Sequence, residues 1–178
     1  MQRIVLGILS LAQHIQLLAE DPERYRPPHC PHCQTSRPWG HGRYWRKADR
    51  RSDARASLNP VAVPRFCCRS CAGTCSRLPE CIAPRRWFDW AVQQAVLLLL
   101  LVGCSVRQCA ASTGRPRRTV QRWGAWLAER DSVFAFFMRS RFAELGRAGD
   151  GPAFWLGVLQ MMSLSRAMAW LDMELDVP

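Results

Sequence analysis

The chain has 178 residues, a formal net charge of +11, and a hydrophobic content of 48% that includes eight tryptophans. This composition excludes a wholly disordered chain, and the length allows one ordinary domain or two or three very small ones. The positive charge is concentrated, because residues 24–86 carry 14 Arg and Lys against three acidic residues. A basic centre of this kind is typical of proteins that bind a polyanion.

Residues 3–20 predict an amphipathic helix, because apolar side chains recur there on one helical stripe. The stripe consists of Ile4, Ile8, Leu11, Ile15 and Leu18. No small-residue cleavage site follows it, so we expect no export signal. We expect residues 1–26 to form this helix and a linker, in a protein that is cytoplasmic, and nucleoid-associated if bacterial.

Two Cys-x2-Cys pairs are the strongest motif in the chain: Cys30 with Cys33, and Cys68 with Cys71. In a reducing compartment such pairs are typical of metal binding and not of disulfides. Four soft thiolates form a closed tetrahedral site that leaves no position for a reacting water. We predict one structural Zn²⁺ held by these four cysteines.

Other residues near the pairs could replace a ligand. Cys67 adjoins Cys68, although only Cys68 has the required spacing to Cys71. Three histidines could also serve: His29, His32 and His41. We expect Cys75 and Cys81 to fill apolar space instead.

Residues 27–83 predict a zinc ribbon built from three short strands. The strands are expected at 41–46, 61–67 and 74–78, with a polar loop or insert at 47–59. The core of such a ribbon is too small to fold well by itself, so the metal would contribute folding free energy directly.

The next segment, residues 84–130, predicts a helix-turn-helix. An apolar helix at 87–102 ends at Gly103, a short helix follows at 105–112, and a third begins at Pro116 and runs to about Glu129. Three residues define the buried side of the third helix: Val120, Trp123 and Leu127. Three helices with a short turn before the last are the helix-turn-helix arrangement.

The exposed side of the third helix predicts contact with DNA. Arg118, Gln121 and Arg122 lie at positions i, i+3 and i+4, and Arg115 and Arg117 flank the start of the helix. Arg and Gln can bind guanine and adenine edges, and flanking Arg can bind phosphates. The alternative is a solvated cationic face on an ordinary helical bundle.

Residues 131–178 predict a helical C-terminal segment, with one helix at 132–145 and one or two at 153–175. Its apolar residues could form a homodimer: Phe154, Trp155, Leu156, Leu159, Met161, Met162 and Trp170. The apolar run at 95–104 is far shorter than the ~20 residues of a membrane span, so we expect no membrane contact. The expected fold class is therefore α+β, mainly α.

Residues 20–130 resemble a known family. The segment Asp21–Pro27, the first cysteine pair, His41–Tyr44, Pro64–Phe66, the second pair, Thr74 and Leu78–Pro79 are similar to an insertion-sequence-associated zinc-ribbon domain of the DUF6431 type. In transposase-like proteins such a ribbon is followed by a helix-turn-helix, as at Ser105–Trp126. The resemblance implies sequence-directed DNA binding, and Cys67 departs from the family pattern.

We therefore expect a zinc-dependent, transposase-like DNA-binding protein: a remnant of a transposable element or an accessory factor to one. Fewer than 50 residues follow Arg130, too few for a nuclease core, and no Ser-His-Asp set or phosphate-binding loop is present, so we expect no enzymatic activity. Two alternatives remain. One is the DNA-binding component of an active transposase whose catalytic part is encoded separately. The other is a zinc-stabilised module that binds RNA or protein.

Overall fold

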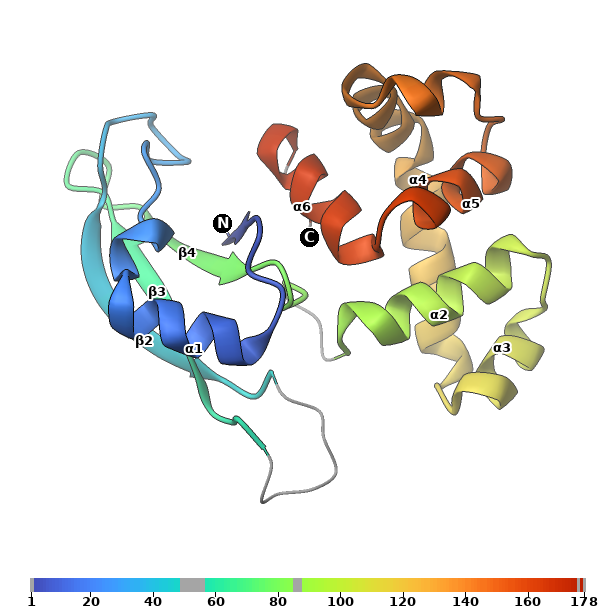
Figure 1. The fold of residues 1–178 in the computed structure, drawn as a ribbon, viewed down its shortest axis with the longest axis horizontal. Helices are drawn as coiled ribbons and strands as arrows, with labels where there is room; N and C mark the ends of the chain where they lie inside the picture. The colour runs from blue at the N-terminus through green and yellow to red at the C-terminus, as the bar shows by residue number, and fades with distance from the viewer. Residues whose placement is uncertain (1, 49–56, 85–87, 176, 178) are drawn as a thin grey trace. The chain divides into compact units, whose positions relative to one another are not determined.

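A computed structural model describes residues 2–48, 57–84, 88–175 and 177 (Figure 1). The chain divides into two compact units, residues 1–89 with 175–178, and residues 90–174. The described residues form six α-helices and one four-stranded mixed sheet, which confirms the α+β class. Across these same ranges, no helix combines the length and the apolar character that crossing a bilayer requires.

The first unit is built on the sheet, whose strand order is β1-β4-β3-β2. Three strands match the predicted ones: β2 (Trp39–Arg46), β3 (Val61–Cys67) and β4 (Thr74–Pro79). β2 pairs antiparallel with β3, and β3 pairs antiparallel with β4. β1 (Gln2–Val5) adds a parallel edge beside β4. Residues 49–56 of the predicted loop lie outside the described residues.

The prediction of one helix over residues 3–20 is wrong at its start. Gly7 has φ +81°, which the right-handed helix does not allow, and the helix α1 begins only at Leu11 and ends at Glu20. Ser10 caps it by accepting the N–H of Gln13 at 3.1 Å. The apolar residues of the predicted stripe extend across this break, because β1 and the turn after it also bury apolar side chains. The stripe therefore does not mark a single helix.

Helix α1 lies across one face of the sheet (Figure 1). A buried cluster joins them, with Leu18 and Tyr25 packing against Ala62 and Phe66 of β3. Val61 and Val63, which alternate with these residues along β3, form a second cluster with Leu78 of β4 and Ile82. Full burial of each large apolar side chain contributes about 1.5–3 kcal/mol, so the N-terminal segment is part of this unit and not a separate linker.

His14 is a fully buried polar group in this unit. Its Nδ1 lies 2.6 Å from the Tyr25 hydroxyl and its Nε2 lies 2.8 Å from the Ala62 carbonyl oxygen. The carbonyl can only accept, so Nε2–H donates to it and Nδ1 accepts from Tyr25. The neutral ring therefore satisfies both partners, and burial lowers the pKa of His14 below its ordinary value.

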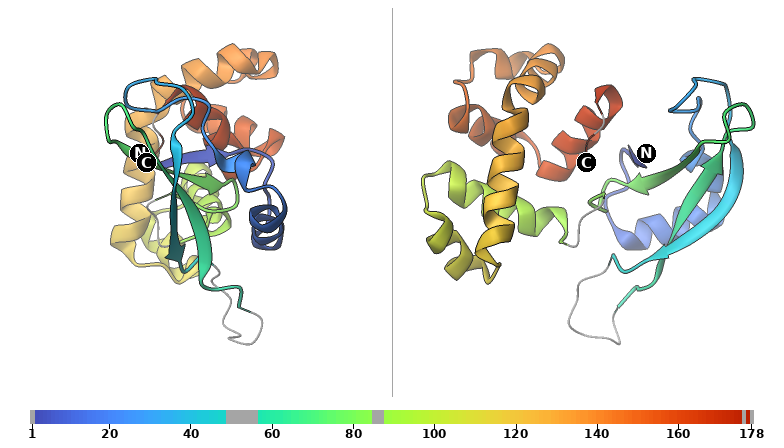
Figure 2. Two further views of the ribbon diagram at one scale, coloured as in Figure 1. Left: turned by 90° about the vertical axis from the view of Figure 1, so that its left-hand side faces the viewer. Right: turned by 180° about the vertical axis from the view of Figure 1, so that it is seen from behind.

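The second unit is entirely helical in the described residues (Figure 2). Its helices are α2 (Trp90–Leu101), α3 (Val106–Thr113), α4 (Arg117–Arg141), α5 (Pro152–Met161) and α6 (Leu164–Glu174). The predicted breaks are present, since Gly103 and Gly114 both have positive φ, 92° and 65°. Ser105 begins α3 with a capping box that Gln108 completes.

Helix α4 differs from the prediction, because it continues through residue 130 to Arg141 as one helix of 25 residues. Leu127 and Phe134, seven residues apart, are both buried, so the apolar stripe passes the predicted boundary without interruption. The expected segments 84–130 and 131–178 consequently share this helix. The helix predicted at 132–145 is its second half, followed by a 3-10 turn at Ala143–Arg147.

Two of the residues proposed for dimerisation belong to the core of the second unit. Phe154 and Trp155 are 0% and 1% exposed, and the Trp155 ring packs edge-on against Phe134 with centroids 6.1 Å apart. They are therefore not surface residues that a second copy could contact.

We expect the buried His14 to make the stability of the protein depend on pH. Its pKa is lowered from 6.5 in the folded chain, so protonation favours unfolding. As the pH falls below 6.5, the free energy of unfolding should decrease by up to about 1.4 kcal/mol per pH unit relative to a His14→Gln variant. Above 6.5 the difference between the two proteins should be constant.

Urea unfolding of both proteins from pH 8 to pH 5 measures this difference. The variant is the matched control, because Gln can still donate to Ala62 and accept from Tyr25, and the cysteines titrate alike in both proteins. Parallel stability curves over the whole range would contradict the assignment.

Candidate metal centre

The pairing of β2 with β3 brings the two cysteine loops together. Trp39, near the start of β2, lies opposite Cys67, at the end of β3. The loop with Cys30 and Cys33 precedes Trp39, and the loop with Cys68 and Cys71 follows Cys67, so both lie at one end of the sheet (Figure 2). The second loop is the connection between β3 and β4.

The two loops have the same backbone geometry. In each, the N–H of the first cysteine donates to the carbonyl five residues later, at 2.8 Å from Cys30 and 2.9 Å from Cys68. The residue after the second cysteine is left-handed in both, Gln34 with φ 61° and Ala72 with φ 55°. Such values are uncommon outside glycine, so both loops hold a sharp turn that directs their thiols inward.

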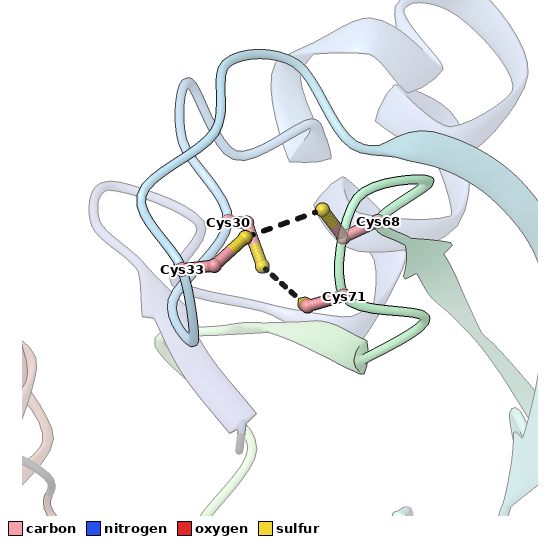
Figure 3. A group of neighbouring side chains, drawn as sticks. All are labelled: Cys30, Cys33, Cys68 and Cys71. Carbon is pink, nitrogen blue, oxygen red and sulfur yellow. Dashed lines mark hydrogen bonds between the residues drawn. The ribbon is translucent and has the colours of Figure 1, made fainter.

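The four cysteine sulfurs face one another (Figure 3). Cys30 Sγ lies 3.7 Å from Cys71 Sγ, Cys33 Sγ lies 3.5 Å from Cys68 Sγ, and all four lie within 4.8 Å of one another. A tetrahedral ion with metal–sulfur bonds of about 2.3 Å separates its sulfurs by roughly 3.8 Å. The group could therefore hold one metal ion, as the sequence predicts.

The electrostatics of the cluster favour a bound cation. Cys33 Sγ lies 3.3 Å from Thr35 Oγ1, and hydrogen bonds with Thr35 lower the pKa of Cys33 to about 6. A hydrogen bond with the backbone of Cys71 lowers the pKa of Cys68. The N–H of Gly73 lowers the pKa of Cys71, but the neighbouring thiols and desolvation together outweigh it and raise that pKa to about 12. Four thiolates at this spacing repel one another unless a cation lies between them.

The alternative ligands lie outside the cluster. The group that could hold an ion, among the described residues, consists of the four predicted cysteines and includes neither Cys67 nor a histidine. Cys67 Sγ lies 3.8 Å from the carbonyl oxygens of Cys68 and Ala72 instead. His32 contacts the carbonyl oxygen of Thr74, from which its Nε2 lies 3.3 Å. Cys75 is buried in the core, as expected.

Two supporting features of the site were not predicted. A Cβ on Gly73 would lie 2.7 Å from His32 Cδ2 and 3.1 Å from Cys71 Sγ, so glycine is required where the loops meet. The Arg69 guanidinium lies 3.6 Å from the centroid of the Trp39 ring and ties the second loop to β2. The contacts of Gly73 with His32 and of Arg69 with Trp39 join residues at least 30 positions apart, and no local sequence pattern signals them.

The predicted DNA-contacting residues lie in the second unit, at the start of α4. Four of the five are exposed: Arg117, Arg118, Gln121 and Arg122. Arg115 is half-buried, and its Nε donates to the Thr113 carbonyl at 3.0 Å, which holds the turn between α3 and α4. The three side chains predicted to be buried on this helix are buried: Val120, Trp123 and Leu127.

Comparison of the chain with protein-family models, with curated proteins and with solved structures gives no match.

We expect a Gly73→Ala variant to bind metal about 10- to 100-fold more weakly, because the added methyl displaces the His32 ring and the adjacent Cys71. Competition with a chromophoric chelator for Zn²⁺ measures the affinity. Gly40→Ala is the control, since a Cβ at Gly40 meets nothing within 4 Å.

A second substitution tests whether contact with the His32 ring causes the loss of affinity. Removing the ring in a His32→Ala, Gly73→Ala double variant should restore most of the lost affinity. If the double variant binds as weakly as Gly73→Ala alone, contact with His32 is not the reason that position 73 is glycine.

Proposed function

We propose that the protein is a zinc-dependent, transposase-like DNA-binding protein in which the metal stabilises the first unit and α4 contacts DNA. The observation that carries the proposal is the cationic, exposed start of α4, which follows a short turn after α3. The metal centre supports a structural role for the ion and no catalytic one, because four cysteine ligands complete a tetrahedral shell.

The choice of zinc rests on the chemistry of the donors. Four thiolates are soft ligands that favour zinc over the hard cations magnesium and calcium, which prefer oxygen. The matched geometry of the two loops supports a tetrahedral arrangement, and zinc has no geometric preference that would oppose it. A bound ion also removes the repulsion among the thiolates, so metal binding and folding of this end of the sheet are coupled.

The start of α4 supports an anionic partner. A helix N-terminus carries partial positive charge and is normally stabilised by acidic residues, yet the first turn of α4 has none and contains Arg117 and Arg118. Pro116 provides no side-chain cap. A phosphate backbone would supply the negative charge that this turn lacks.

The arrangement of α3 and α4 supports duplex DNA as that partner. Gly114 turns the chain between the two helices, and the cores of both are fixed by buried residues, Cys109 on α3 and Trp123 on α4. The exposed face then presents Arg118, Gln121 and Arg122, side chains able to read guanine and adenine edges in a major groove. The resemblance of residues 20–130 to insertion-sequence-associated domains supports a role with a transposable element.

We expect the purified protein to contain one Zn²⁺ per chain, and a Cys68→Ser variant to lose it. Cys67→Ser is the matched control, because Cys67 adjoins Cys68 but lies outside the cluster, so this variant should keep its ion. Mass spectrometry under native conditions, together with elemental analysis, measures both the stoichiometry and the metal. A folded native protein without metal, or loss of the ion in both variants, is incompatible with the assigned ligands.

We expect Arg118→Ala and Arg122→Ala each to weaken DNA binding by about 1–3 kcal/mol if the arginine contacts a base. A lost phosphate contact instead reduces the slope of log K against log salt by about 0.9. The DNA is selected from a random pool with zinc-loaded protein, and binding is measured by fluorescence anisotropy at several salt concentrations. Arg130→Ala, an exposed arginine later on α4, is the control and should change neither quantity.

Competition separates the two classes of nucleic acid. Duplex DNA of the selected sequence should displace the labelled probe at lower concentration than RNA of the same sequence. Preferential displacement by RNA would favour an RNA-binding module, and unchanged affinity in both arginine variants would exclude α4 as the reading helix.

A further inference from the structure

The second unit contains a cavity whose lining includes none of the residues proposed to contact DNA. It has a volume of about 240 Å³ and lies between α2, α4 and the start of α5. Its wall includes Leu97, Leu100 and Leu101 of α2, Leu127 and Asp131 of α4, and Trp155 of α5. A dry apolar cavity of ~150 Å³ already admits benzene, so this one can hold a larger organic group.

The leucine run of α2 is far too short for a membrane span, and three of its leucines line the cavity instead. Leu97 is buried within the unit, whereas Leu100 and Leu101 remain half-exposed where they line the cavity. Leu100 packs against α4 at Gly124, where an added Cβ would lie 3.2 Å from Leu100 Cδ1, and it also borders the cavity. These leucines line the hollow together with the buried rings of Trp155.

Small residues of α4 form part of the lining of the hollow. Gly124 lines it, although glycine destabilises a helix interior relative to alanine. A Cβ at Gly124 would lie 3.2 Å from Leu100 Cδ1, so even a methyl group would press on the wall. Ala128, one turn later, is exposed at the rim. Glycine at position 124 therefore lets α2 and α4 approach closely beside the hollow.

Asp131 adds a carboxylate to the mainly apolar wall of the cavity. Among the described residues that line the hollow it alone is charged. Trp155 Nε1 donates to Asp131 Oδ1 at 2.7 Å, which fixes the carboxylate at the wall and leaves Oδ2 for another donor. A fixed carboxylate beside leucine and tryptophan complements a cationic head attached to an apolar body.

We propose that this cavity binds a small amphiphilic organic cation, with its ammonium group on Asp131 and its aromatic or aliphatic body against Leu97, Leu127 and Trp155. The site is independent of the metal centre and of the proposed DNA-contacting residues, so it stands whether or not the protein binds DNA.

Three probes with the same aromatic body and different heads test the proposal on the full-length, metal-loaded protein. They are 2-phenylethylammonium, the neutral 2-phenylethanol and the anion 3-phenylpropanoate. Titration followed by the indole N–H resonance of Trp155 in NMR spectra should give the tightest binding for the cation, about tenfold tighter than for the alcohol, and the weakest for the anion. Equal affinity for all three, or no saturable shift with any, would overturn the proposal.

Variants test the two halves of the site separately. Asp131→Asn keeps an oxygen that accepts from Trp155 but removes the charge, so the preference for the cation over the alcohol should disappear while the alcohol still binds. Ala128→Trp places a large ring at the rim and should abolish binding of all three probes. Ala95→Trp is the control, an exposed alanine on α2 outside the cavity lining, and should bind as the native protein does.

Two results with these variants would contradict the proposal. If Asp131→Asn keeps the preference for the cation, the carboxylate does not select the head group. If Ala128→Trp binds the probes normally while remaining folded by circular dichroism, the probes occupy a different place.

Discussion

The convergence of four cysteine side chains at one end of a small sheet is the constraint on which the first unit depends. The sulfurs of Cys30, Cys33, Cys68 and Cys71 lie within 4.8 Å of one another, too close for all to be ionised without a cation between them. The backbone reduces this repulsion only in part, by donating N–H groups to sulfur, as His32 and Gly73 do at 3.4 Å. A bound cation would replace this repulsion with attraction between the ion and each sulfur.

The remaining stability of the first unit comes from segments that are distant in sequence. β1 extends the sheet, α1 covers one face, and backbone N–H groups of Glu80 and Cys81 donate to the carbonyls of Val5 and Ile8 at 3.1 and 3.2 Å. The buried His14 joins α1 to β3 through two hydrogen bonds. A ribbon of three strands alone would bury little apolar surface, so these additions stabilise the unit whether or not the four cysteines hold an ion.

Helix α4 is long enough to carry two separate features. Its first turns present the exposed Arg117, Arg118 and Arg122 after the turn at Gly114. Its middle turns, from Gly124 to Asp131, form one wall of a leucine-lined cavity. The buried stripe that includes Trp123, Leu127 and Phe134 is continuous between them, so both features share one rigid element.

The amino-acid sequence by itself determined the four cysteines that come together, the three antiparallel strands β2, β3 and β4, and the buried face at the start of α4. Each depends on a local pattern: the spacing of a cysteine pair, alternation along a strand, or a recurrence of three to four residues along a helix. The helix break at Gly103 and the turn at Gly114 could also be predicted from the sequence, because glycine tolerates the positive φ angles found there.

Only the tertiary structure decided the rest. It made residues 2–5 a strand, because their hydrogen-bond partners lie more than 70 positions away in β4. It packed the second half of α4 against α5, where the Phe134 and Trp155 rings meet edge-on with centroids 6.1 Å apart. It also placed Asp131 beside the leucines of α2, since a cavity exists only once separate helices have packed around it. These features are non-local, and no pattern within a short window of the sequence encodes them.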